Sequence, residues 1–369
     1  METINFANWK KNLINDSNNY NSPICVQYEL TARCNLDCKM CYVHNQDSNK
    51  LKDQELSTEQ WKAIMDDAFN NGMMFATLTG GECLLRHDFK ELYLHLWKKG
   101  VYITILSNGI LIDDELAELL KQHQPEKVRV SIYGSTEDGY RNVTGHTGRD
   151  RAINGLKKLK DAGINVQVNV TGSSYIASDY INTLCYIKEQ GFNPLLSELA
   201  LIPKRNDPES AEHYMKPDDV VSLAHERNRL FRKVYPPCTD LPKIGGDCKE
   251  PCSFGMTCNA GRSMAVVCWD GRMMPCASLP SWDGPSLKEM SFADAWKITV
   301  EQAKKIVQPA ECEGCAYKKA CPKCVVMRAE DLYSGHCNPE VCELTKRLVA
   351  AGVKKLDKPQ ENDEDEFEH

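Results

Sequence analysis

The sequence predicts an α/β protein whose core is a partial, open (β/α)6 barrel, similar in plan to a TIM barrel. Six short runs rich in β-branched residues alternate with amphipathic stretches of helical period. Strands that alternate with helices in this way pair in parallel through right-handed crossovers. Six units are too few to close an eight-stranded barrel. Polar and glycine-containing motifs follow several of the runs, at the strand ends where such sheets bind ligands.

The expected elements follow one another in a regular order. The first expected helix begins at Ser57, with Gln60 three residues later, which is typical of a capped N-terminus. This helix spans residues 57–72 and another spans 151–163; each is amphipathic and ends at a glycine. Strands are expected at residues 25–31 (CVQYELT), 75–79 (FATLT), 101–106 (VYITIL), 127–132 (KVRVSI), 164–170 (INVQVNV) and 194–200 (PLLSELA).

Composition narrows the class of protein. The 369 residues are 42% hydrophobic and 26% charged, which is ordinary for a globular chain with two domains. A net charge of −7 argues against a large nucleic-acid-binding surface. The chain has no apolar run long enough to cross a membrane, and its start, METINFANWKK, lacks the apolar region of a secretory signal. We therefore expect a cytoplasmic protein without membrane or nucleic-acid partners.

The chain contains 18 cysteines, a number that indicates metal or cluster binding in a compartment where disulfides are rare. Most of them lie between Cys238 and Cys342. We expect a short N-terminal extension, a core domain, a cysteine-rich domain and an acidic disordered tail, at residues 1–24, 25–235, 236–350 and 351–369 respectively.

Three of the cysteines form a compact motif directly after the first expected strand. Cys34, Cys38 and Cys41 have C-x3-C-x2-C spacing, one ligand short of a closed metal or cluster site. TGGE (79–82), SNG (107–109) and SIYG (131–134) follow the next three strands. A zinc knuckle with a distant fourth ligand, or three inert thiols, would explain the cysteines alone but not this series of motifs.

The cysteine motif and TGGE together resemble the signature of the radical S-adenosylmethionine (SAM) enzymes, over roughly residues 25–235. The resemblance implies that the three thiolates hold a 4Fe–4S cluster whose fourth iron binds SAM. An electron from the cluster then cleaves SAM to methionine and a 5′-deoxyadenosyl radical. A non-catalytic iron–sulfur or zinc protein, for electron transfer or scaffolding, is the alternative, but such a protein has no need of a SAM pocket.

The resemblance also implies SAM contacts. It assigns them to Gly80, Gly81, Glu82, Asn108, Ser131, Arg141 and Asn169. The glycines are expected to let the backbone approach the ligand, and Arg141 to pair with the SAM carboxylate. Met40 stands where the family usually has an aromatic residue against adenine, and Cys83 where a proline often follows Gly-Gly-Glu.

The C-terminal cysteines, at roughly residues 245–345, resemble the SPASM extension, which houses two auxiliary 4Fe–4S clusters. The resemblance suggests Cys252, Cys258, Cys276 and Cys324 for one cluster. It suggests Cys312, Cys315, Cys321 and either Cys342 or Cys337 for the other, with Cys342 favoured. The last interval of the C-x2-C-x5-C-x2-C run is one residue shorter than usual. A zinc ribbon is the alternative for such pairs.

The resemblance to radical SAM enzymes with a SPASM extension implies a peptide maturase, which we expect to cross-link a ribosomally made precursor peptide oxidatively through a thioether, C–C or C–O bond. Epimerisation is an alternative, with Cys83 or Cys268 as the candidate hydrogen-donating thiol. Ala277 stands where sulfatase maturases place a basic aspartate, which disfavours that activity; a small-molecule dehydrogenase is a further alternative. Expected partners are the precursor peptide and a flavodoxin- or ferredoxin-type reductant. Because only 24 residues precede the first strand, we also expect either a separate leader-recognition protein or leader binding by the body of the enzyme itself.

Overall fold

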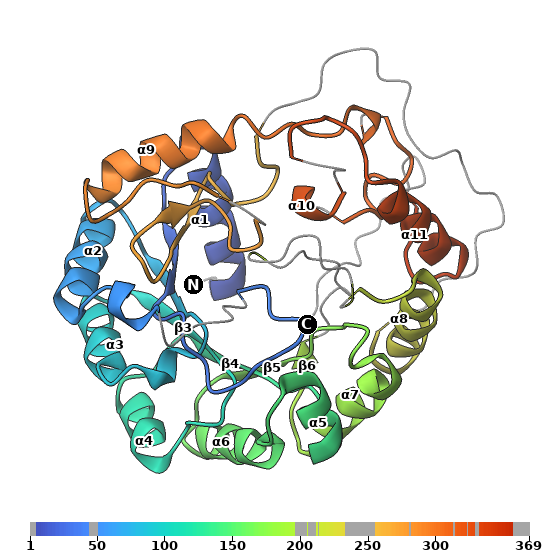
Figure 1. Ribbon diagram of the computed structural model, residues 1–369, viewed down its shortest axis with the longest axis horizontal. Coiled ribbons are helices and arrows are strands. Elements are labelled where there is room, and N and C mark those ends of the chain that lie inside the picture. The colour runs from blue at the N-terminus through green and yellow to red at the C-terminus, as the bar shows by residue number, and fades with distance from the viewer. Residues whose placement is uncertain are drawn as a thin grey trace. The chain divides into compact units, whose positions relative to one another are not determined.

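The computed structural model describes residues 5–43, 51–195, 205, 212, 214–232, 255–279, 282–312, 314–322, 324–328 and 332–356 (Figure 1). The chain forms two compact units. The first comprises Met1–Lys216 and Gly255–Ile306, and the second comprises Pro217–Phe254 and Val307–His369.

The first unit is built on one sheet with the strand order β6-β5-β4-β3-β2-β1-β7-β8. Its strands are β1 (Cys25–Glu29), β2 (Phe75–Thr79), β3 (Tyr102–Ser107), β4 (Lys127–Ser131), β5 (Val166–Asn169), β6 (Pro194–Leu195), β7 (Met264–Val267) and β8 (Met273–Met274). All six predicted strands are present and pair in parallel, in chain order, which confirms the partial barrel. Residues 196–200 of the sixth predicted strand lie outside the described residues.

Two further strands were not predicted. β7 pairs in parallel with the free edge of β1, and β8 pairs antiparallel with β7. Residues 255–306 therefore belong to the same compact unit as β1, although the sequence suggested a domain boundary at residues 235 and 236.

Helices cover the outer face of the sheet because that face carries the apolar strand residues. Tyr28 of β1 is fully buried and its ring meets that of Trp61 at 5.8 Å, edge to face. Trp61 lies on α2 (Thr58–Asn70), whose N-terminus has the predicted capping box of Ser57 and Gln60. α3 (Phe89–Trp97), α4 (Asp114–Gln122), α5 (Glu137–Thr144), α6 (Arg149–Asp161) and α7 (Tyr180–Glu189) follow, and α9 (Phe292–Ala303) lies beside α2 (Figure 1).

The inner face of the sheet is polar, and its amino edge is covered by a helix. Gln27 and Thr77 are in register on this face, and Arg129 donates from Nε to Gln167 Oε1 at 2.9 Å. α1 (Phe6–Tyr20) contacts the amino ends of β2 and β3 through Trp9–Phe75 and Phe6–Tyr102 ring contacts at 6.2 and 5.0 Å. The motifs lie at the opposite edge, at the carboxyl ends of the strands, and the candidate site is built there.

The second unit holds α8 (Pro217–Phe231), α10 (Val325–Arg328) and α11 (Pro339–Ala350). Tyr317, Ala320 and Val349 form a small buried cluster. Val353 is 5% exposed, so the folded part continues past the predicted start of the tail at residue 351, whereas residues 357–369 lie outside the described part of the chain.

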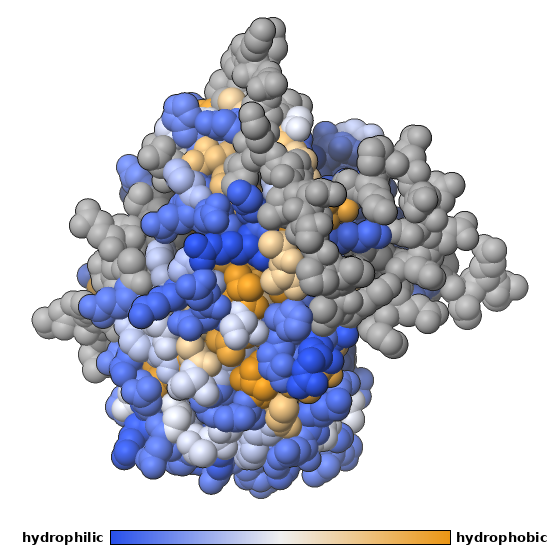
Figure 2. Space-filling view, turned by 90° about the vertical axis from the view of Figure 1, so that its right-hand side faces the viewer, coloured by the Kyte–Doolittle hydropathy of each residue, from blue (hydrophilic) through white to orange (hydrophobic). Residues whose placement is uncertain are grey.

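The surface view in Figure 2 shows mainly hydrophilic residues with scattered apolar patches between them. Among the helices of the described ranges, none has both the length and the apolar character needed to span a bilayer.

Candidate functional site

The loop that carries Cys34, Cys38 and Cys41 follows β1 and is anchored to the end of α5. The amides on either side of Cys38 donate to α5 carbonyls, Asp37 N to Thr144 O at 2.9 Å and Lys39 N to Val143 O at 3.0 Å. Burial raises the pKa of the Cys34 thiol to about 12 and that of Cys38 well above its usual value, with a smaller contribution from neighbouring thiols of the loop. A bound cluster would hold these groups as thiolates.

The TGGE loop packs directly against the cysteine loop. Gly81 N donates to Thr31 O and Glu82 N donates to Arg33 O, each at 2.8 Å. A Cβ atom on Gly80 would lie 2.5 Å from Thr31 O, and one on Gly81 would lie 2.3 Å from Arg33 O. From the sequence, Gly80 and Gly81 were expected to let the backbone approach a ligand. In the described contacts they instead let the backbone of the TGGE loop approach that of the cysteine loop.

Glu82 is fully buried and organises the neighbouring loop instead of facing solvent. Its carboxylate accepts from Asn108 N at 2.7 Å, Ser107 Oγ at 3.0 Å and Leu84 N at 3.1 Å. Burial raises its pKa, although these hydrogen bonds oppose the shift. Asn108 in turn donates from Nδ2 to Asn35 Oδ1 at 2.7 Å and lies 3.9 Å from Cys34 Sγ. The structure therefore brings Glu82 and Asn108 to the cysteine loop.

The ends of β4 and β5 supply a second polar group. Ser131 and Asn169 are in register, and Asn169 Nδ2 donates to Thr171 Oγ1 at 3.3 Å. The Tyr133 hydroxyl bonds to the side chains of Ser131 and Thr171. Burial, with the nearby Cys38 thiol, raises the pKa of Tyr133 to about 12. Sequence reasoning passed over Tyr133, although it is the third residue of SIYG.

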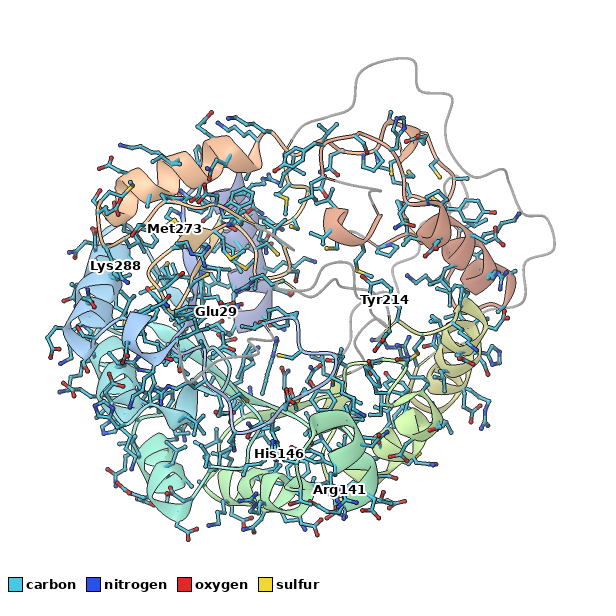
Figure 3. The ribbon with its side chains drawn as sticks, in the orientation of Figure 1. Glu29, Arg141, His146, Tyr214, Met273 and Lys288 are labelled. Atoms are coloured by element: carbon cyan, nitrogen blue, oxygen red, sulfur yellow. The ribbon has the colours of Figure 1, made fainter. Side chains whose placement is uncertain are left out.

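Arg141 does not reach the cysteine loop. Its neighbours Tyr140 and Thr144 are fully buried, so the helical phase of α5 turns Arg141 outwards. Its side chain is 58% exposed and pairs with Asp138 at 2.9 Å (Figure 3). The expected pairing of Arg141 with SAM is not supported by this position. Met40 is partly exposed within the cysteine loop.

Neither candidate hydrogen-donating thiol is exposed. Cys83 is fully buried and its Sγ donates to Leu106 O at 3.4 Å, while Cys268 is 4% exposed and lies 3.4 Å from Met274 Sδ. Burial raises the pKa of both thiols well above the usual value. These surroundings are typical of structural cysteines.

A buried ion pair joins the cysteine loop to the Cys276 segment. Glu29, at the end of β1, is fully buried (Figure 3) and receives two hydrogen bonds from the Arg205 guanidinium, at 2.8 and 2.9 Å. Arg205 also donates from Nη2 to Ala277 O at 2.7 Å and from its backbone N to Tyr42 O at 2.8 Å. Three segments of the first unit, those that contain Glu29, Tyr42 and Ala277, therefore meet at Arg205.

The cysteines assigned to the first auxiliary cluster are only partly described. Cys258 and Cys276 are partly buried in the first unit, and Ser278 N lies 3.4 Å from Cys276 Sγ. Cys324 belongs to the second unit, and Cys252 lies outside the described residues.

In the second unit, five cysteines line one cavity of about 310 Å³. They are Cys312, Cys315, Cys321, Cys337 and Cys342. Cys312 Sγ and Cys337 Sγ lie 3.5 Å apart, and the Glu311 carboxylate accepts from Cys337 N at 3.2 Å. Five convergent sulfurs suit an iron–sulfur cluster better than a buried structural core. Within the described ranges, no three His, Cys, Asp or Glu groups are placed to hold a single metal ion.

Comparison with known proteins agrees with this geometry. Residues 28–176 match the model of the Radical SAM superfamily. The chain is 27% identical to AdoMet-dependent heme synthase of Methanosarcina barkeri over 326 residues, covering 82% of this chain and 91% of that protein. It is 38% identical to the sporulation killing factor maturation protein SkfB of Bacillus subtilis over 151 residues, or 40% of this chain and 36% of SkfB.

Among solved structures, the fold resembles Streptococcus suis SuiB bound to precursor peptide SuiA, with a TM-score of 0.64 and 16% identity. The superposition covers 92% of this chain and 82% of SuiB, which shows a shared fold. The chain therefore carries a radical SAM domain, in residues 28–176.

Proposed function

We propose that this enzyme matures a ribosomally made peptide by abstracting a hydrogen atom from it and forming a thioether, C–C or C–O cross-link. The observation that carries the proposal is the Arg205 bridge between the Cys41 and Cys276 segments. A cross-link removes a pair of electrons from the peptide, and this bridge holds a second cysteine segment beside the first. Similarity to SkfB and the shared fold with SuiB support a peptide substrate.

In this proposal Cys34, Cys38 and Cys41 hold the cluster that, when bound, supplies the electron for SAM cleavage. Asn108 and Tyr133 would orient SAM beside it, while Glu82 holds Asn108 in place. One auxiliary cluster would use Cys258 and Cys276 of the first unit among its ligands, and the other would use four of the five cysteines around the 310 Å³ cavity of the second unit.

A second candidate is a porphyrin-modifying radical enzyme. The similarity to AdoMet-dependent heme synthase extends over 82% of this chain, a longer match than the one to SkfB. Epimerisation has less support because Cys83 and Cys268 are both buried, and sulfatase maturation because Ala277 carries no basic group.

The test is anaerobic turnover with SAM, a reductant and either a precursor peptide encoded beside this gene or a porphyrin. Loss of a pair of hydrogen atoms from the peptide supports cross-linking. An unchanged mass in H2O, with deuterium uptake when the same reaction is run in D2O, indicates an epimerase, and a change in the mass of the porphyrin supports the second candidate. In the same preparation we expect about twelve irons per chain, at four per cluster. Replacing Cys34, Cys38 and Cys41 together by alanine should remove about a third of this iron. The same variant should form no 5′-deoxyadenosine.

A further inference from the structure

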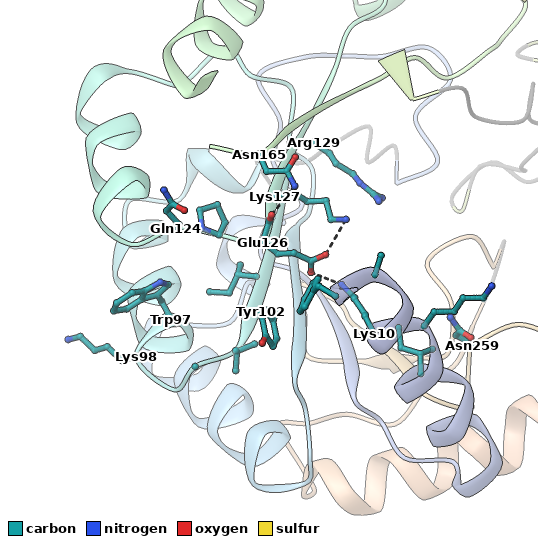
Figure 4. A pocket seen from close by; sticks show the side chains of 18 of the residues that line it. Lys10, Trp97, Lys98, Tyr102, Gln124, Glu126, Lys127, Arg129, Asn165 and Asn259 are labelled. Atoms are coloured by element: carbon teal, nitrogen blue, oxygen red, sulfur yellow. Dashed lines mark hydrogen bonds and ion pairs between the residues drawn. The ribbon is translucent and has the colours of Figure 1, made fainter. Parts of the chain in front are cut away.

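A large groove lies at the amino edge of the sheet in the first unit, opposite the edge that carries the cysteine loop. Its volume is about 1200 Å³, and it is bounded by α1 and by the turns that lead into β3, β4 and β5 (Figure 4). Neither the radical SAM site nor the auxiliary cysteines account for it.

The groove lining carries an excess of positive charge. Lys10, Lys11, Lys98, Lys127 and Arg129 line it, against one carboxylate, that of Glu126. Glu126 pairs with Lys10 at 2.5 Å and with Lys127 at 3.1 Å (Figure 4). Burial alone would raise the pKa of Glu126, but the two lysines outweigh it and lower the pKa. With Glu126 ionised, four net positive charges remain along the lining.

Aromatic side chains stand beside these cations. Phe6 and Tyr102 are 40% and 39% exposed, although their rings pack 5.0 Å apart. Gln124 and Asn165 add amide groups, and Asn165 Nδ2 donates to Glu126 O at 3.2 Å. Exposed aromatic surface next to cations and amides suits an extended peptide that carries both carboxylates and apolar side chains.

We propose that this groove binds an acidic segment of the precursor peptide, a proposal that rests on the peptide-maturase function. Because the groove lies at the opposite strand ends from the cysteine loop, it can hold one segment while another segment of the same peptide reacts. Binding at the groove would raise the effective concentration of the reacting segment. A concave groove suits a peptide, whereas a folded protein partner usually docks over a broad surface.

The first experiment measures binding to the full-length, cluster-loaded protein without SAM or reductant. The probe is a fluorescein-labelled twelve-residue peptide of alternating glutamate and leucine, followed by fluorescence anisotropy. Lys98→Glu should weaken binding about fivefold or more, since it replaces an attraction with a repulsion. Lys121→Glu makes the same charge change on α4, outside the groove, and should leave affinity unchanged. Equal losses in both variants, or no binding, would overturn the proposal.

Aromatic variants test the apolar part of the groove. Phe6→Ala should weaken binding of the same probe, whereas Tyr20→Ala should not, because Tyr20 is 81% exposed at the other end of α1 and does not line the groove. A weakening by Tyr20→Ala equal to that by Phe6→Ala would contradict the assignment.

Turnover separates this proposal from the proposed function. With a precursor peptide that the enzyme modifies, Lys98→Glu should raise KM and leave kcat unchanged. If the peptide is modified with unaltered KM, the groove proposal fails while the maturase function stands. If the probe binds as expected but no precursor is modified, the maturase function fails. If Lys98→Glu instead slows reduction by an acidic flavodoxin, the groove serves the reductant and the proposal is overturned.

Discussion

Tyr140 is a buried side chain whose electrostatic neighbours include the Cys38 thiol. It is fully buried, and its hydroxyl has no hydrogen-bond partner in the described part of the chain. It lies on α5, whose end receives the amides on both sides of Cys38. Burial, followed by the charge of the Cys38 thiolate, raises the pKa of Tyr140. A buried hydroxyl without a hydrogen-bond partner destabilises the fold, unless a bound group supplies that partner.

We therefore predict opposite outcomes for Tyr140→Phe with and without the cluster. In the cluster-free protein the free energy of unfolding should stay the same or rise by about 1 kcal/mol, because an unpaired polar atom is removed. In the loaded protein the midpoint potential should fall, since a hydrogen bond to a ligand sulfur favours the reduced cluster. Redox titration followed by EPR measures this. Tyr93→Phe, whose hydroxyl bonds to His123 O, is the control; an unchanged or higher potential would contradict the prediction.

The free energy of unfolding should depend on pH through Asp88, and the direction of this dependence follows from the hydrogen-bond partners of its carboxylate. Burial alone would raise its pKa, but hydrogen bonds from Arg86 and Thr58 outweigh it and lower the pKa below 3.8. Because the pKa of Asp88 is lower in the folded than in the unfolded protein, the ionised carboxylate stabilises the fold fully at any pH above the unfolded-state pKa. This stabilisation is lost as the pH falls through the folded-state pKa. Asp88→Asn should cost about 2–4 kcal/mol at pH 7. The difference from the wild type, measured by urea unfolding, should shrink only below about pH 4; a difference that shrinks between pH 7 and pH 5 would contradict this.

At the scale of elements, the contact between the TGGE and cysteine loops is sensitive to one added atom. Gly81→Ala would place Cβ 2.3 Å from Arg33 O, a backbone atom that cannot move without its loop. We expect a loss of about 3 kcal/mol and a loss of iron bound by Cys34, Cys38 and Cys41. Gly163→Ala is the control. It has a φ of +76° but no neighbour within 4 Å in the described ranges, so it should cost only about 1–2 kcal/mol of backbone strain and retain iron.

The regular elements were predictable where local signals were complete. The first five parallel strands each had a run with β-branched residues followed by a helical pattern, and the α2 cap was visible in Ser57 and Gln60. β7 could not be predicted in this way, because its sequence is not part of such a strand-and-helix pattern. Its residues, Met264–Val267, pair with β1 from more than two hundred positions away, and only the exposed edge of β1 in the folded sheet gives β7 its place.

At the scale of the whole molecule, the sequence predicted which motifs lie at one edge of the sheet. Parallel strands present their carboxyl ends at one edge, so Cys34, Glu82 and Asn108 come together. The expected contact of Arg141 with SAM stays a prediction without support from its exposed position, because one step along α5 decides whether a side chain faces inward or outward. The sequence could not predict the Glu29–Arg205 pair, whose members are 176 positions apart and have no shared pattern.

This pair gives the last prediction, because it joins three distant segments. Arg205→Leu leaves Glu29 buried without a partner and should lower the free energy of unfolding by about 3–5 kcal/mol. Replacing both residues, Arg205→Leu with Glu29→Leu, should recover much of this loss, because no uncompensated charge remains. Arg141→Leu, which breaks the exposed pair with Asp138, should cost less than about 1 kcal/mol.

Urea unfolding of the four proteins measures the coupling between Glu29 and Arg205. A double variant as unstable as the sum of the two single variants would show that the pair does not act as a unit. Arg205 also donates from Nη2 to Ala277 O and from its backbone N to Tyr42 O. The double variant should keep the backbone bond to Tyr42 and lose the bond to Ala277, and with it the connection between the Cys41 and Cys276 segments. We therefore expect the double variant to recover stability without recovering turnover, which separates the role of the pair in folding from its role in the site.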